Sequence, residues 1–308
     1  MIPEWLTPAI MTIITASTPL VFAAVGEIMV EKSGVLNLGV EGMMIMGAVA
    51  AFAIGVTTGS ATLAILFGAL AGLMLALIFG LLTLNLRANQ VATGLALTLF
   101  GLGLSALIGH SFVGETFPGL PKLDIPIISE VPIIGPLVFG QDVLVYMSVA
   151  SVIFAGWFLN RTRWGLVLRA VGENHDAAHA IGHPVNFVRM MAVLFGGSMA
   201  GLGGAYLSLA YTPLWVENMT AGRGWIALAL VVFASWRPGR AIFGAYLFGG
   251  ITILQLHVQG FGVAIAPQLM SMLPYLATIV VLVLISHDAA RFRLSAPASL
   301  GKTFHPSQ

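Results

Sequence analysis

The chain has 308 residues, of which 58% are hydrophobic and only 8% are charged. A soluble globular protein carries about 25% charged residues, so most of this surface cannot face water. The net charge of +1 gives no basic surface for nucleic acid, and the absence of cysteine excludes disulfides, thiolate nucleophiles and cysteine-bound metals. The composition therefore predicts an all-α, polytopic integral membrane protein.

Apolar runs of about 20 residues, the length that crosses a bilayer as a helix, recur along the whole chain. They predict about nine transmembrane helices, within a range of eight to ten, near 7–28, 35–55, 61–83, 90–109, 142–159, 187–209, 224–236, 241–259 and 268–286. The run at 224–236 is too short for a simple span, and the run at 35–55 opens with polar residues and glycines. One or two broken or short helices are therefore expected at these places.

Basic residues gather in a few connecting segments, and such segments face the cytoplasm. With nine spans and an outside N-terminus, one side of the membrane collects Arg87, Arg161, Arg163, Arg169, Arg237, Arg240, Arg291, Arg293 and Lys302. The segment 110–141 then lies outside, and Arg223 is the one discordant charge. We therefore expect a cytoplasmic loop at 160–186 and a cytoplasmic tail at 287–308.

Two short motifs look like catalytic or nucleotide-binding sites. Gly301-Lys302-Thr303 resembles the end of a phosphate-binding loop, but that loop needs a glycine where this chain has Ala296. A solvated basic tail is the favoured interpretation. His175, Asp176, His179 and His183 have the helical spacing of a metal site, yet they lie in a polar loop. We interpret them as a solvated helix face, so no metal or cofactor is expected.

Pairs of glycines four residues apart inside the apolar runs predict close helix packing. They are Gly68 with Gly72 and Gly197 with Gly201. Gly101 and Gly103 superficially match a dinucleotide turn, but they lie within a continuous apolar run. Close helix packing is therefore expected there as well.

The 160–186 loop contains Asp176-Ala177-Ala178-His179-Ala180-Ile181-Gly182. Small alanines permit close contact, the acid suits a helix N-terminus, and Gly182 followed by Pro184 stops the helix. This stretch resembles the cytoplasmic E-A-A-x-x-x-G loop of permease subunits of binding-protein-dependent ABC importers, with Asp in place of Glu. Four further stretches resemble the branch of that family that serves simple sugars, branched-chain amino acids and nucleosides, namely residues 33–44, 89–98, 169–174 and 220–239.

The resemblance implies a single permease domain over residues 1–308 in the bacterial inner (plasma) membrane. Such a subunit has no ATPase site and works by alternating access, driven by ATP hydrolysed in separate subunits. The implied partners are an ABC ATPase, a second permease that is similar but distinct, and an extracytoplasmic solute-binding protein. A nucleoside is the expected substrate and a simple sugar the next, and the alternatives are an ion-coupled secondary transporter and an intramembrane metalloprotease.

Candidate functional residues fall into two groups. The resemblance places coupling to the ATPase at Arg169, Glu173, Asp176, Ala177, Ala178 and Gly182. Polar residues inside a membrane are costly and often functional, which makes candidates for a translocation path of Asn37, Glu41, Asn89, Gln90, Glu217, Asn218 and Trp225. Glu41 is the favoured member, because glycines flank it in the suspected break. An aromatic belt at the outer interface is the expectation for Tyr211, Trp215 and Trp225.

Overall fold

A computed structural model describes residues 6–123, 139–260 and 296–305, together with a few isolated positions between these ranges. The described residues form helices and connecting segments, with two isolated β-bridges and no strand. Six of the helices are long and apolar enough to cross a membrane: α1 (Leu6–Lys32), α2 (Val40–Thr58), α3 (Ala61–Gly80), α4 (Gln90–Gly109), α5 (Val143–Arg161) and α8 (Val185–Tyr206). Two of them continue in π-helical turns, α3 to Asn85 and α8 to Tyr211.

The other helices are α6 (Arg163–Glu173), α7 (His175–Ala180), α9 (Arg223–Phe233) and α10 (Pro238–Gly260). The structure therefore confirms an all-helical polytopic membrane protein, but six spans among the described residues do not support the count of about nine. The predicted run at 224–236 forms α9, whose 11 residues extend only about 16 Å. The predicted run at 268–286 lies mostly outside the described residues.

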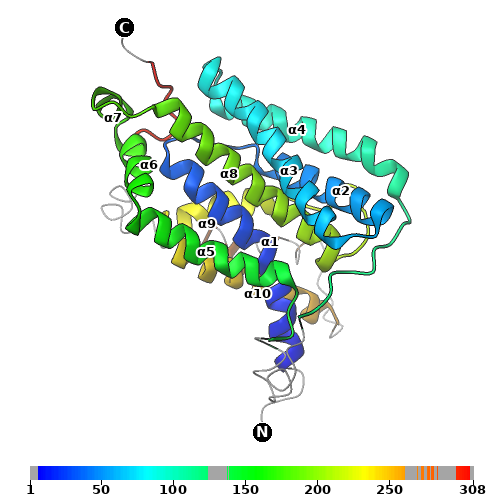
Figure 1. Cartoon of the computed structure of the whole chain (residues 1–308). Coiled ribbons are helices and arrows are strands. Elements are labelled where there is room, and N and C mark those ends of the chain that lie inside the picture. Colours follow the sequence, from blue (N-terminus) through cyan, green and yellow to red (C-terminus); the bar gives the residue numbers. More distant parts are fainter. Residues whose placement is uncertain are drawn as a thin grey trace.

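Helix α8 lies at the centre of the bundle and packs against α1, α2 and α3 (Figure 1). The close approach depends on glycine: a Cβ on Gly197 or Gly201 would overlap the backbone of α3 at Gly72 or Gly68, and a Cβ on Gly204 would overlap the Met44 carbonyl of α2. Small residues let helix backbones touch where the lipid offers no hydrophobic driving force. The predicted packing glycines of α3 and α8 are thus confirmed.

The glycine pair in α4 behaves differently at its two members. Gly101 packs on the backbone of Gly42 in α2, as expected. Gly103 is exposed, and a Cβ there would meet nothing within 4 Å. The packing expectation is therefore wrong for Gly103, because it lies on the outer face of α4.

One end of the bundle collects the basic connecting segments. Figure 1 shows α6 and α7 beside the described part of the tail, at the end opposite the N-terminus. Lys32 at the end of α1 lies close enough to Arg169, Glu173 and Arg237 to interact with their charges, and Arg87 Nη1 lies 3.3 Å from His305 Nδ1. We call this the basic end.

The chain re-enters the bundle after α8. It leaves the π-helical turn at Tyr211 at the opposite end, where Leu214 forms a β-bridge with Thr116. It then runs through residues 212–222 into α9, whose first turn contacts the first turn of α2. Helix α9 is therefore a short helix that begins inside the bundle and ends at the basic end.

Candidate functional site: a clamped short helix and the coupling segment

Glu41 lies in the first turn of α2 and fastens the start of α9. Its side chain is buried, and its Oε1 accepts hydrogen bonds from Thr220 Oγ1 at 2.5 Å and from the Gly222 amide at 2.8 Å. Its Oε2 accepts a third bond from the Gly224 amide at 2.6 Å. The first amides of a helix have no partner within the helix and carry partial positive charge, so a carboxylate satisfies them well. Glu41 therefore joins α2 to α9.

The segment between α1 and α2 is held by side chains from both sides of it. Asn37 is fully buried. Its backbone amide donates to Glu27 Oε1 at 3.3 Å, and its side-chain Oδ1 accepts from the Gly39 backbone amide at 2.9 Å. Gln90 of α4 is also buried and accepts from the Leu36 amide through Oε1 at 2.8 Å. Its Nε2 has no hydrogen-bond partner among the described residues. The expected break before α2 is thus present, with its backbone satisfied by neighbouring side chains.

The other candidates for a translocation path are exposed. Glu217 and Asn218 lie in the loop before α9, and Trp225 lies in the first turn of α9. Asn89 is the N-cap of α4, where its Oδ1 accepts a hydrogen bond from the Ala92 amide at 2.9 Å. The structure thus brings three exposed candidates to the start of α9 and gives Asn89 a capping role elsewhere.

Arg223, the discordant charge of the sequence, is satisfied locally. Its Nη1 donates to the carbonyls of Met219 at 3.0 Å and Thr220 at 3.3 Å, and its guanidinium lies 5.4 Å from the centroid of the Tyr211 ring. Two carbonyls and an aromatic face stabilise the cation away from the basic end. Trp215 is buried against Gly109 of α4, so the aromatic-belt expectation is wrong for this residue.

Glu31, in the last turn of α1, fastens the other end of α9. Trp236 is buried, and its Nε1 donates to Glu31 Oε2 at 2.5 Å. Lys32 Nζ lies 6.0 Å from the centroid of the same ring. Ser235 and Trp236 have φ of 51° and 54°, values that residues other than glycine rarely adopt. The bond to Glu31 and the burial of the indole hold this turn in place.

Residues 160–186, to which the sequence assigns coupling and which we call the coupling segment, form two short helices, each with a side-chain cap. Thr162 Oγ1 accepts a hydrogen bond from the Gly165 amide at 2.9 Å at the start of α6, and Asn174 Oδ1 accepts from the Ala177 amide at 3.0 Å at the start of α7. Gly182 follows α7 with φ of 92°, a left-handed conformation that glycine adopts without a steric penalty. The predicted short helix and its glycine stop are both confirmed.

The predicted coupling residues differ in exposure. Those on the outer surface are Glu173, Asp176, Ala177 and Gly182, whereas Arg169 is half-buried. Ala178 is 2% exposed and packs into the chain itself, so only one of the two alanines can meet another protein. Ile181 is 73% exposed and presents a large apolar side chain beside α7.

Arg189 of α8 fastens the coupling segment to the bundle. The side chain is fully buried, with Nε donating to the Ser33 carbonyl at 3.1 Å and Nη1 to the Lys302 carbonyl at 3.1 Å. Its Nη2 lies 3.2 Å from His175 Nδ1 in α7. One guanidinium therefore joins the end of α1, the tail and α7.

The tail is fastened to the same place. The Ser299 amide donates to the Gly172 carbonyl at 2.8 Å, and Ser299 Oγ donates to the Glu173 carbonyl at 3.2 Å. The Gly301 amide donates to the Gly34 carbonyl at 3.1 Å. Gly301 and Lys302 are exposed, as the interpretation of a solvated tail expects. The stretch is nevertheless not free, because its backbone bridges α6 and the break after α1.

The histidines of α7 pack on the tail. The rings of His175 and His179 meet Phe304 edge-on, with centroids 5.4 and 5.2 Å apart. Burial lowers the pKa of His175, and the Arg189 guanidinium lowers it further, so the neutral ring can accept at Nδ1. No three His, Asp or Glu side chains among the described residues converge as ligands for a metal ion.

The fold around these sites can be compared with known proteins. A family model described as the permease component of the branched-chain amino acid transport system matches residues 9–283. The chain belongs to this permease family. The identification with permeases of ABC importers made from the sequence is thereby confirmed, and the chain is a permease subunit of an ABC transporter.

Similar permeases come from several organisms. The chain is 40% identical to the "Putative glucose ABC transporter permease protein TsgC13" of Haloferax volcanii over 95% of both chains. It is 34% identical to the nucleoside ABC transporter permease protein NupC of Lactococcus lactis, over 87% of this chain and 89% of the relative. It is 31% identical to the guanosine ABC transporter permease protein NupQ of Bacillus subtilis, over 76% and 77%.

Several residues that fasten this permease are absent from the sequence-based candidates. They are Glu27, Glu31, Arg189, Thr220, Trp236 and Ser299. Glu27, Glu31 and Arg189 carried a usable signal, because each is an ionisable residue within or next to an apolar run. Ser299 carried no usable signal, because the backbone carbonyls that it contacts lie far away in the sequence.

Proposed function

We propose that this permease imports a nucleoside, using ATP that separate subunits hydrolyse. The family match over residues 9–283, together with the exposed helix α7 at the basic end, carries the proposal. Two of the relatives are named for nucleoside and guanosine transport. A chain of this family needs an ATPase subunit and an extracytoplasmic solute-binding protein, which are the expected partners.

A second, distinct permease is the expected membrane partner. Relatives named for one substrate occur as different chains in one organism, since NupQ and NupP of Bacillus subtilis are both guanosine ABC transporter permease proteins. Two such chains would enclose the path between them. Exposed groups at the start of α9 are suited to face that path, and they include Glu217, Asn218 and Trp225.

The buried path candidates serve the same movement indirectly. Both carboxylate oxygens of Glu41 accept hydrogen bonds at the start of α9. Asn37 and Gln90 hold the break before α2. We propose that these three set the position of α9, while the exposed residues contact the solute. Among the residues that the structure describes, Gln90 Nε2 has no hydrogen-bond partner, so it is a buried donor next to the break.

Coupling to the ATPase is proposed to run through α7. The exposed residues of α7 are Asp176, Ala177, His179 and Ala180, and the exposed Ile181 and Gly182 follow it. Arg169 and Glu173 of α6, which directly precedes α7, are proposed to share this role. The exposed Ile181 is suited to a groove in the partner, because an isolated apolar side chain gains most where it becomes buried. Ile181→Ser should therefore weaken co-purification of the ATPase, whereas the exposed Ala180→Ser should not.

The proposed orientation places the basic end in the cytoplasm and the N-terminus outside. Helix α10 begins at the basic end beside Trp236 and runs away along α1, and the tail at 296–305 lies at the basic end again. Nine crossings result if α9 with its leading loop, α10 and the run at 268–286 are added to the six spans.

Cysteine labelling tests this orientation, because the chain has no cysteine of its own. An impermeant thiol reagent should label Glu115→Cys in intact cells and should leave Ala180→Cys unlabelled until the cells are opened. Both positions are exposed in the structure. The reverse pattern would overturn the orientation.

Transport by the reconstituted system tests the function. The permease, its co-purifying ATPase, the second permease and the binding protein are placed in proteoliposomes, and uptake of guanosine is measured. Uptake should require ATP, stop with vanadate and persist with an uncoupler. Uptake abolished by the uncoupler alone would support ion coupling and contradict the proposal.

Glucose is the second candidate substrate. It is favoured by TsgC13, whose identity of 40% extends over 95% of this chain. A competition experiment separates the two. Excess glucose should leave guanosine uptake unchanged if the system is a nucleoside importer, and uptake of glucose without uptake of guanosine would assign the sugar.

A further inference from the structure

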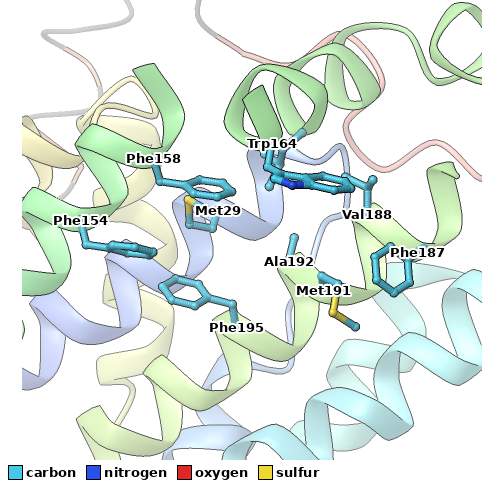
Figure 2. A pocket seen from close by; sticks show the side chains of 10 residues that line it. Met29, Phe154, Phe158, Trp164, Phe187, Val188, Met191, Ala192 and Phe195 are labelled. Carbon is cyan, nitrogen blue, oxygen red and sulfur yellow. The ribbon is translucent and has the colours of Figure 1, made fainter. Parts of the chain in front are cut away.

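A groove opens on the side of the bundle near the basic end, between α1, α5, α6 and α8. Its volume is about 270 Å³ (Figure 2). Figure 2 shows the rings of Phe154, Phe158 and Phe195 along one part of it and Trp164 and Phe187 along another. The groove is therefore walled by α6 as well as by three membrane helices.

The lining of the groove excludes water as its occupant. Every lining side chain is aliphatic, aromatic or a thioether, with the indole nitrogen of Trp164 as the sole polar side-chain atom. A buried water needs two to four polar partners, which this lining does not offer. An apolar cavity of about 150 Å³ already holds benzene, so this groove has room for a stretch of hydrocarbon chain.

The groove opens where lipid is present. Trp164, Phe187 and Met191 are 59%, 55% and 44% exposed, and Phe154 is 46% exposed. Such a set of large apolar side chains at the cytoplasmic ends of membrane helices faces hydrocarbon and not water. Trp164 marks the level of the interface, where tryptophan is enriched.

Charge at the mouth of the groove selects the headgroup. Helix α5 ends at Arg161 and α6 begins at Arg163, and both side chains are exposed. The chain from Val143 to Gly172 contains no acidic residue, and neither does α8. The nearest acid along the chain is Glu173, at the far end of α6. Two exposed guanidinium groups without an adjacent acid suit a phosphate, which arginine binds in a fork-like geometry.

We propose that the groove binds an anionic phospholipid of the adjoining leaflet, with one acyl chain between Phe154 and Met191 and the phosphate at Arg161 and Arg163. The lipid would brace α6 against α5 and α8, so that the position of the coupling segment depends on lipid composition. The identity of the leaflet as cytoplasmic rests on the proposed orientation, whereas the existence of the site does not.

Photo-cross-linking tests the acyl chain. The full permease with its partner subunits is placed in nanodiscs that contain phosphatidylglycerol with a photoreactive acyl chain, and cross-linked peptides are identified by mass spectrometry. Cross-links should map to residues 154–158 and 187–195. Ala192→Phe, which fills the groove, should abolish them, and Gly156→Phe should retain them because a Cβ on Gly156 meets nothing within 4 Å.

A second variant covers the case that Ala192→Phe fails to fold. Met191→Trp blocks the mouth from an exposed position and should also abolish the cross-links. Cross-links that persist in the blocked variants would overturn the site. Cross-links from the groove to a protein segment instead of lipid would assign it to a protein contact and would equally overturn the proposal.

The headgroup is tested by competition. Unlabelled phosphatidylglycerol should displace the probe from the wild-type protein far better than phosphatidylcholine. In a double variant, Arg161→Gln with Arg163→Gln, the two lipids should compete equally, while Arg237→Gln with Arg240→Gln should keep the preference. Equal competition in the wild-type protein would contradict the anionic headgroup, whatever the transport assay shows.

Discussion

Helix α9 and the coupling segment are two parts of this permease whose helices are too short to cross the membrane alone. Each is fastened by a buried charged side chain, and the two side chains have opposite signs. The start of α9 offers backbone amides, and the carboxylate of Glu41 accepts from them. The end of α1 and the tail offer carbonyls, and the guanidinium of Arg189 donates to them. Backbone amides without a helical partner thus favour a buried carboxylate beside them, and backbone carbonyls without one favour a buried guanidinium.

The largest loss of uptake is expected from a substitution of Glu41, the side chain that fastens α9. Glu41→Gln removes the charge and presents an amide group where a backbone amide now donates. Each hydrogen bond to a charged group contributes about 1.5–3 kcal/mol, so loss of one corresponds to about a tenfold or greater fall in uptake. Uptake in proteoliposomes measures the effect, with Glu115→Gln, at an exposed position outside the proposed path, as the matched control. Normal uptake by a normally assembled Gln variant would show that the hydrogen bonds of the Glu41 carboxylate are dispensable.

Arg189→Lys tests the guanidinium that fastens the coupling segment. Lysine keeps the charge but cannot reach the Ser33 carbonyl, the Lys302 carbonyl and His175 at once. We expect a several-fold loss of ATPase co-purification and faster tryptic cleavage in the coupling segment. Arg240→Lys, at an exposed position, is the control. Full retention of the ATPase would mean that the tail and α6 hold the segment without Arg189.

A backbone change in the coupling segment should have a smaller effect. Gly182 has φ of 92° and open space around its Cβ position, so Gly182→Val acts through backbone strain and not through a clash with its neighbours. Such strain costs about 1–3 kcal/mol, and it should partly uncouple ATP hydrolysis from uptake. Gly182→Asn should be milder, because asparagine tolerates the left-handed region. Equal activity of the Val and Asn variants would contradict this account.

The smallest expected effect is a dependence on pH through His175. Burial and Arg189 lower its pKa below 6.5 in the folded protein, so its contribution to stability is present above pH 6.5 and is lost as the pH falls through the lowered value. The ATPase should therefore dissociate more readily at about pH 5.5 than at about pH 7.5. His175→Gln should remove this dependence, whereas His179→Gln should keep it. An unchanged pH dependence in His175→Gln would assign it to another group.

The structure also changes what is expected of the histidine variants. The interpretation of these histidines as a solvated helix face implies that His175→Ala and His179→Ala are both mild. His175 is buried between Arg189 and Phe304, so removing its ring leaves a guanidinium nitrogen without its partner. His179 is exposed apart from its contact with Phe304, and the prediction of a mild effect stands for it.

The sequence predicts features that depend on local pattern. Apolar runs locate the six spans, the polar start of the 35–55 run locates the break before α2, and Gly182 with Pro184 locates the end of α7. These signals work because hydrogen bonding within a helix and the conformational freedom of glycine are local properties. A short apolar run likewise identifies α9 as too short to span.

Long-range partners could not be predicted in the same way. Glu41 meets Thr220, 179 residues later, and Arg189 meets Lys302, 113 residues later. Nothing in the local pattern of either residue names its partner, because the contact exists only after the helices have packed. Sequence analysis could therefore single out Glu41 as unusual, but it could not show that α9 uses the whole carboxylate.

The tail segment at 296–305 is synthesised after the helices that it contacts. Residues 296–305 follow every described helix in the chain, yet they supply partners for the carbonyls of Gly34 and Gly172 and for Arg189. The membrane helices can be inserted before this stretch leaves the ribosome, but the surface around α7 cannot. Under the proposed coupling through α7, a nascent permease therefore cannot present its finished surface to the ATPase until translation has passed this stretch.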